Sequence, residues 1–137
     1  MLGALDHVGY LTDDLDRAVA EFTARFSLPV ARTLELPQFS IQAVFLGPGT
    51  GCIELFTLTD DRLLEERLDG QSILLDHAAH GVEDIDATVA QLAGNGVRFS
   101  GPDRRQEVRE PLALGGGRHI WTIPESSCGQ SLQIIQL

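Results

Sequence analysis

The strongest constraint on how this chain folds is an internal repeat with an offset of 70 residues. Residues 7–22, "HVGYLTDDLDRAVAEF", align without gaps on residues 77–92, "HAAHGVEDIDATVAQL". Five of the sixteen aligned pairs are identical: His7/His77, Asp14/Asp84, Asp16/Asp86, Val19/Val89 and Ala20/Ala90. A repeat of this length indicates that one supersecondary unit occurs twice in the chain.

Each copy begins with a short strand that ends at acidic residues, and a helix follows. Acidic residues favour a helix start because a carboxylate accepts hydrogen bonds from the free N–H groups and suits the helix dipole. Apolar residues then recur at helical spacing, as Leu15, Val19, Phe22 and Phe26 in the first copy and as Ile85, Val89 and Leu92 in the second. The glycines of "GNG" at residues 94–96 end the second helix.

Three strand-like segments follow each helix. They cover residues 29–36, 40–47 and 51–58 in the first copy and residues 97–101, 118–124 and 130–137 in the second. We therefore predict an α+β fold in which two βαβββ repeats form an eight-stranded curved sheet around a cleft, with the helices outside. A single domain would cover residues 1–137, divided into module one (about 1–59), a linker with a short helix (about 60–72) and module two (about 73–137).

The repeat also brings polar residues to equivalent strand positions. His7 matches His77 in the first strand of each copy, and Glu54 matches Gln133 in the last. A single histidine in such a strand is more often a hydrogen-bonded core residue than a ligand, but an ionised carboxylate on an inner sheet face is costly unless it is paired. Two imidazoles and two side-chain oxygens suit a divalent Zn, Ni, Co, Mn or Fe ion. Because side chains alternate along a strand, His80 should face away from His77 and lie outside this group.

The net negative charge of the chain disfavours some classes of binding partner. The net charge is −10, and all ten basic residues are arginine, so binding to nucleic acid or to an anionic membrane is not expected. The sequence has neither a run of eighteen apolar residues nor a start typical of a signal peptide. Cys52 and Cys128 have no zinc or redox spacing. We expect a free-thiol protein of the cytoplasm.

These residues resemble those of the vicinal oxygen chelate superfamily, which includes glyoxalase I, extradiol dioxygenases, bleomycin-resistance proteins and, most similar here, methylmalonyl-CoA epimerase. The resemblance covers nearly the whole chain. Its segments are "LDHVGYLTDDLDRAV", "AVFLGPGTGCIELF", "LLDHAAHGVEDIDATVAQLAGNGVRF", "GGGRHIW" and "SLQIIQL". It implies that the metal ligands are His7, Glu54, His77 and Gln133.

Two positions depart from the pattern of the superfamily. The last strand usually ends with a glutamate that also moves the substrate proton, whereas Gln133 can coordinate through its oxygen but cannot act as a base. The second glutamate of the epimerase falls on Gln38 or Phe39. The resemblance therefore leaves Glu54 as the candidate catalytic base in addition to its role as a ligand. It also disfavours dioxygenase chemistry, because the single glutamate comes from the other module.

From these features we expect a metal-dependent isomerase or lyase that acts on a small carbonyl, carboxyl or acyl-CoA substrate through a metal-stabilised enolate. The alternative is a non-catalytic small-molecule binding or sequestering protein of the same fold, which the missing bases favour. We also expect a homodimer. A CoA substrate would need cations for its phosphates, and the only cationic cluster is Arg104, Arg105 and Arg109, which otherwise forms a solvated loop.

One further motif leaves two interpretations open. The run "GGGR" at residues 115–118 is either a lid hinge over the cleft or a hairpin turn. His119 and Trp121 follow on one face of the next strand, where Trp121 is expected to belong to the core.

Overall fold

The computed structural model describes all of residues 1–137 and consists of two compact units. The N-terminal unit is His7–Asp76, and the C-terminal unit combines Met1–Asp6 with His77–Leu137. Two strands, β1 (Leu5–Thr12) and β5 (Ile73–Gly81), run across the boundaries of these units. The chain therefore crosses from one unit to the other inside continuous strands and not through a loop.

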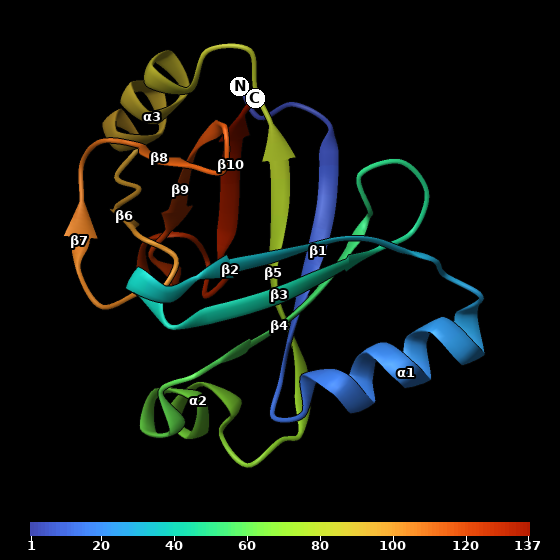
Figure 1. Cartoon of the computed structure of the whole chain (residues 1–137). Coiled ribbons are helices and arrows are strands. Elements are labelled where there is room, and N and C mark those ends of the chain that lie inside the picture. Colours follow the sequence, from blue (N-terminus) through green and yellow to red (C-terminus); the bar gives the residue numbers. More distant parts are fainter. The chain divides into compact units, whose positions relative to one another are not determined.

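The N-terminal unit has the predicted order of strand, helix and three strands (Figure 1). After β1 come α1 (Leu15–Phe26), β2 (Val30–Leu36), a 3-10 turn (Pro37–Phe39), β3 (Ile41–Leu46), β4 (Ile53–Leu58) and α2 (Asp61–Leu68). The strand order is β2-β3-β4-β1, in which β1 and β4 are parallel and the other pairs are antiparallel. Helix α2 is the short helix predicted for the linker.

The C-terminal unit repeats this arrangement. After β5 come α3 (Ile85–Gly94), β6 (Phe99–Ser100), β7 (Glu107–Val108), β8 (Leu112–Leu114), β9 (Gly117–Thr122), a 3-10 turn (Pro124–Ser126) and β10 (Leu132–Gln136). Its strand order is β5-β10-β9-β6, and β5 and β10 are parallel, as β1 and β4 are in the other unit. The predicted α+β fold with two βαβββ repeats is confirmed.

The strand count differs from the prediction, because the structure has ten strands where eight were expected. The additional strands β7 and β8 lie in the arginine-containing segment that was expected to be a solvated loop. They form because this segment folds back along existing strands, so that β7 pairs with β6 and β8 pairs with β9. Pairing gives their backbone N–H and C=O groups partners that a loop would have to find in water. Strand β6 is also shorter than the predicted segment 97–101.

Equivalent aspartates start the equivalent helices. The Asp14 carboxylate accepts a hydrogen bond of 3.1 Å from the Arg17 N–H at the start of α1, and the Asp84 carboxylate accepts one of 2.9 Å from the Ala87 N–H at the start of α3. Each bond satisfies a donor that the first helical turn leaves without a partner. The repeat is therefore preserved down to the capping contacts.

Each of these two helices packs on one face of its own sheet. In the N-terminal unit, Leu55 and Leu46 are fully buried against α1. In the C-terminal unit, Ile134 and Ile120 are fully buried against α3. Burying a side chain of this size contributes roughly 2 kcal/mol to folding. Because side chains alternate along a strand, the residues next to these four point to the opposite sheet face.

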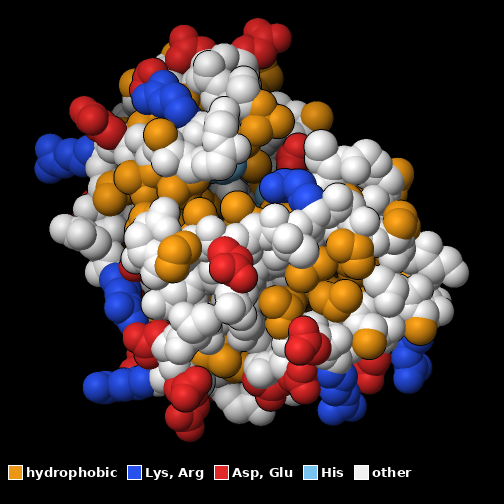
Figure 2. All heavy atoms as spheres, viewed as in Figure 1, with side chains coloured by type: hydrophobic (Ala, Val, Ile, Leu, Met, Phe, Trp, Pro, Cys, Tyr) orange, Lys and Arg blue, Asp and Glu red, His pale blue; other side chains and the backbone are white.

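The charged surface shows no single cationic field. In Figure 2, arginine and acidic side chains lie among one another on the visible face, with hydrophobic side chains between them. In the arginine cluster, Arg104 has a left-handed backbone (φ 57°), and the Arg105 N–H donates to Asp103 at 3.2 Å. Anion binding at this cluster stays a prediction. No helix of the structure is both long enough and apolar enough to cross a membrane.

Candidate metal centre

In the N-terminal unit, His7 and Glu54 lie on the same face of the sheet. Strands β1 and β4 are parallel with Gly9 opposite Glu54, and His7 precedes Gly9 by two residues. Both side chains belong to buried residues, which are 3% (His7) and 8% (Glu54) exposed. The imidazole Nε2 lies 3.6 Å from the carboxylate Oε1. The two side chains therefore lie close together on one face of this unit's sheet.

The separation of these two atoms suits a shared ion better than a direct hydrogen bond. At 3.6 Å the contact is longer than an ordinary hydrogen bond. Two ligands that each lie about 2.0–2.2 Å from a tetrahedral ion are about 3.4 Å apart. Phe45 lies opposite Glu54 on β3 and contacts the His7 ring edge to face, with 5.2 Å between the ring centroids. This contact restricts how the imidazole can turn.

The C-terminal unit repeats the same geometry with an amide in place of the carboxylate. Strands β5 and β10 are parallel with Ala79 opposite Gln133, and His77 precedes Ala79 by two residues. His77 and Gln133 are each 6% exposed. The register that relates His7 to Glu54 therefore also relates His77 to Gln133.

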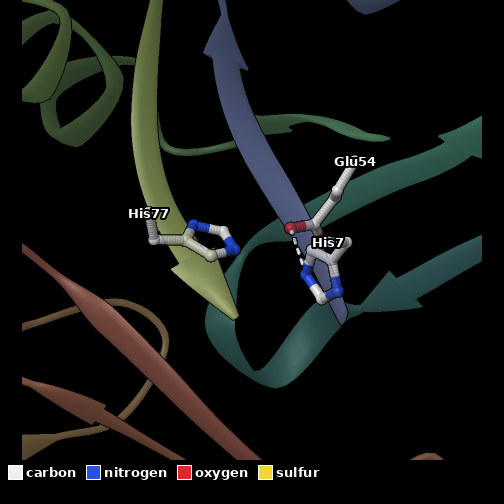
Figure 3. Close-up of side chains that lie close together, drawn as sticks. All are labelled: His7, Glu54 and His77. Atoms are coloured by element: carbon white, nitrogen blue, oxygen red, sulfur yellow. Dashed lines mark ion pairs between the residues drawn. The ribbon is translucent and has the colours of Figure 1, made fainter. Parts of the chain in front are cut away.

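Figure 3 shows His7, Glu54 and His77, three buried residues whose side chains offer ligand atoms of the kind that could hold a metal ion. Two imidazole nitrogens and one carboxylate oxygen are a donor set that zinc and other divalent first-row metals accept. The residues present therefore fit such an ion. His80 is outside this group, as predicted, and its Nδ1 lies 3.0 Å from the Gly3 carbonyl oxygen.

Gln133 has a hydrogen-bond partner that the sequence did not indicate. Its Nε2 lies 3.1 Å from Nδ1 of His119 on β9. The sequence placed His119 on one face of its strand, but it gave no register between β9 and β10, and the contact depends on that register. The partner of Gln133 could therefore not be predicted from the sequence alone.

No carboxylate occupies the other position at which the epimerase has a base. Gln38 and Phe39 lie in the 3-10 turn between β2 and β3, where Gln38 is exposed and Phe39 packs against the core. The two cysteines, Cys52 and Cys128, are free thiols on exposed residues. Glu54 is the one acidic residue among the three that could hold a metal ion.

A clear electrostatic effect is found at the surface of the C-terminal unit. Arg118 on β9 donates two hydrogen bonds, of 2.6 and 2.8 Å, to the carboxylate of Asp86 in the first turn of α3. These bonds lower the pKa of Asp86 and raise the pKa of Arg118. The pair ties the start of α3 to β9.

Comparison with known protein families supports the similarity seen in the sequence. The sequence model of the Glyoxalase/Bleomycin resistance protein/Dioxygenase superfamily matches residues 6–111, which is more than half of the chain. The chain belongs to this superfamily. None of the curated proteins matches the sequence of this superfamily member.

Solved structures show how widely the fold of this superfamily member is shared. Methylmalonyl-CoA epimerase from Mycobacterium tuberculosis is 20% identical, with a TM-score of 0.82 over 98% of this chain and 88% of that one. A hypothetical protein from Bacillus halodurans C-125 is also 20% identical, with a TM-score of 0.82 over 98% of this chain and 94% of that one. A methylmalonyl-CoA epimerase in complex with methylmalonyl-CoA and NH4+ is 23% identical, with a TM-score of 0.79 over 99% of this chain and 95% of that one. At these identities the likeness establishes the fold.

Proposed function

We propose that this protein is a metal-dependent isomerase whose metal ligands are His7, Glu54, His77 and Gln133. The observation that carries the proposal is the buried pair His7 and Glu54, whose Nε2 and Oε1 atoms lie 3.6 Å apart and whose strand register is repeated by His77 and Gln133 in the other unit. The fourth ligand would be the carbonyl oxygen of Gln133, since its strand register repeats that of Glu54. A bound Zn, Ni, Co, Mn or Fe ion would act as a Lewis acid toward carbonyl or carboxyl oxygens of a small substrate.

Glu54 is the proposed proton carrier of this reaction. An amide cannot accept a proton near neutral pH, so neither Gln133 nor Gln38 can serve as the base. Glu54 would take the proton from the carbon next to the substrate carbonyl and then return a proton to that carbon. Isomerisation needs no further reactant, and a lyase would use the same first step. The epimerase structure that holds methylmalonyl-CoA makes an acyl-CoA ester the first substrate to test.

A second candidate function has its own support. Both positions at which the epimerase has a glutamate base carry residues without a carboxylate, Gln133 in β10 and Gln38 in the turn before β3. A protein that only binds or sequesters a small molecule would need no base at either position. The same fold and the same ligand group would then serve binding without turnover.

Metal analysis and a proton-exchange assay separate these functions. We expect purified protein to contain about one divalent ion per chain and His7→Ala to lose it, while the matched control His80→Ala keeps it. The metal-loaded protein is then incubated with methylmalonyl-CoA in D2O, and deuterium uptake at the carbon next to the thioester is followed by NMR. Uptake that Glu54→Gln abolishes supports the isomerase. Binding of methylmalonyl-CoA without deuterium uptake supports the binding protein, and a parent protein that takes up no metal contradicts the metal site.

Two other expectations belong with this proposal. We expect a homodimer, which light scattering on the purified protein would test by its molar mass. We also expect the protein to lie in the cytoplasm, which fractionation of the producing cells would test.

A further inference from the structure

We infer that His119 is a positioning residue that fixes the carboxamide of Gln133, so that its oxygen is the atom left to coordinate a metal. The metal-binding part of this inference rests on the proposed function. The hydrogen-bonding part concerns only the C-terminal unit, to which both residues belong.

The hydrogen bonds of His119 determine which ring nitrogen carries the proton. Its Nε2 lies 3.1 Å from the carbonyl oxygen of Leu114, which can only accept, so Nε2 must donate. In the neutral ring Nδ1 then has a lone pair and accepts the hydrogen bond of 3.1 Å from Nε2 of Gln133. Because nitrogen and oxygen lie on different branches of a carboxamide, Oε1 of Gln133 is turned away from His119.

The strand registers place this oxygen on the sheet face that carries His77. Gln133 lies opposite Trp121 on β9, and His119 precedes Trp121 by two residues, so all three share one face. Gln133 also lies opposite Ala79 on β5, two residues beyond His77. The side chain of Gln133 is therefore held from the β9 side, and His77 lies on the β5 side of the same face.

The imidazole of His119 is itself held in place. It stacks on Trp121 with 6.1 Å between the ring centroids and 18° between the planes, and Trp121 is only 7% exposed. Leu114 and Gly117 pair across a two-residue turn in which Gly115 (φ 57°) and Gly116 (φ 87°) both have positive φ, as a type I′ hairpin requires. The glycine motif is therefore a hairpin turn and not a lid hinge, and it brings the Leu114 carbonyl to His119.

The third glycine of the motif gives the imidazole its space. A Cβ atom at Gly117 would lie 3.1 Å from Nε2 of His119 and 3.1 Å from the Gln136 carbonyl oxygen. A side chain at this position would press on the ring at the atom that bonds Leu114. All three glycines of the motif thus support one arrangement of His119.

This arrangement explains why an amide stands where the superfamily usually has glutamate. A carboxylate at position 133 would face the lone pair on Nδ1 with an oxygen that cannot donate. A neutral ring would have to give up its bond to Leu114 to offer a proton in the other direction, and a ring that donated from both nitrogens would carry a charge. His119 and its hairpin are therefore matched to glutamine, and they hold it as a neutral ligand.

Cobalt binding tests the inference with four variants and a matched control. Co2+ affinity is measured by calorimetry, and its visible absorption reports the number of ligands. We expect His119→Ala to weaken binding by on the order of tenfold to a hundredfold, the usual effect of removing a group that orients a metal ligand. His119→Asn should keep most of the affinity, since the Asn oxygen can take the place of Nδ1. Adding His119→Ala to Gln133→Ala should have no further effect, and His80→Ala should match the parent.

The inference is overturned if His119→Ala binds Co2+ as tightly as the parent, or if its effect adds fully to that of Gln133→Ala. The 15N NMR spectrum of the metal-free parent provides a second test that needs no metal and no variant. We expect His119 to be protonated at Nε2 with Nδ1 as an acceptor, and a proton on Nδ1 would contradict the inference. If the parent binds no Co2+ while this NMR signature is present, the proposed function fails and the fixed orientation of Gln133 stands.

Discussion

The two units carry their candidate ligands at equivalent positions but with different chemistry. In both units a histidine of the first strand and an oxygen-bearing residue of the last strand share a sheet face, with the same parallel register. In the N-terminal unit the oxygen belongs to a carboxylate, and in the C-terminal unit it belongs to an amide. The repeated backbone therefore fixes where the candidate ligands lie, and their side chains decide what each of them can do.

The change from a carboxylate to an amide alters the net charge of the proposed site and the need for a residue that orients the ligand. One carboxylate leaves a divalent ion with an uncompensated positive charge, which two carboxylates would cancel. Glu54 lies 3.6 Å from His7, whereas Gln133 is tied to a third residue, His119, at 3.1 Å. A neutral ligand has a nitrogen as well as an oxygen, so it needs a partner that selects which of the two faces the ion. The N-terminal unit needs no counterpart of His119 because both oxygens of a carboxylate can coordinate.

A second pair of equivalent residues differs in burial. Both candidate ligand histidines follow an aspartate, Asp6 in β1 and Asp76 in β5. The Asp76 side chain is only 4% exposed and bonds Arg67 of α2 at 2.8 Å, whereas Asp6 is exposed. Helix α2 occurs once in the chain and supplies the arginine, so the repeat is broken where the linker helix packs.

Replacing the carboxylate of the N-terminal unit should have the largest effect. Glu54→Gln makes the two units alike and removes the proposed base, so the rate of deuterium uptake should fall by on the order of 10²–10⁴. Metal content is measured alongside by mass spectrometry, since the change also removes a charged ligand. If the variant keeps its metal and its full rate, Glu54 is not the base.

The two aspartates should differ in their contribution to stability. Asp76→Ala leaves the Arg67 guanidinium without its buried partner, and we expect the free energy of unfolding to fall by about 3 kcal/mol. Asp6→Ala is the matched control at the equivalent exposed position and should cost less, at most about 1 kcal/mol, because solvent weakens the interactions of an exposed carboxylate. Urea unfolding followed by circular dichroism measures both values. If both variants lose the same free energy of unfolding, the contact between Asp76 and Arg67 of α2 adds no stability of its own.

Giving the C-terminal unit a carboxylate should be less costly. Gln133→Glu sets an acceptor against Nδ1 of His119, and we expect the metal-free protein to lose about 1–2 kcal/mol of stability, the cost of a buried acceptor without a donor. The variant should show no gain in deuterium uptake, because the lone pair on Nδ1 of His119 repels the new carboxylate oxygen and shifts the side chain. An unchanged unfolding midpoint would argue that Nδ1 does not accept from position 133.

The smallest effect is expected when His80 is replaced. Its equivalent residue in the other unit is not a histidine, and neither residue belongs to the proposed metal site. Its counterpart Tyr10 packs on Phe22, with 5.8 Å between ring centroids, and His80 itself contacts the Gly3 carbonyl oxygen. His80→Ala should therefore leave the metal content at the parent value. A loss of metal in this variant would mean that the group extends beyond the face of His77.

Much of the fold could be predicted because its signals are local or periodic. Helical spacing of apolar residues, capping aspartates and strand alternation each act over a few residues, and the repeat tied the two halves together. The repeat matched His7 with His77 and Glu54 with Gln133, and alternation within one strand separated His80 from His77. The strands β7 and β8 escaped prediction because two or three residues carry no periodic signal.

The sequence by itself thus determined the two βαβββ units, the equivalence of the candidate ligands in the two units and the placement of His80 on the other side of its strand from His77. Only the tertiary structure decided that Gln133 bonds His119, that the glycine run is a hairpin serving this imidazole, and that Asp76 is buried against Arg67. These contacts join residues on different strands or on a helix and a strand, so they depend on register and packing. Register is set by long-range pairing of the backbone, and side-chain patterns along one segment do not record it.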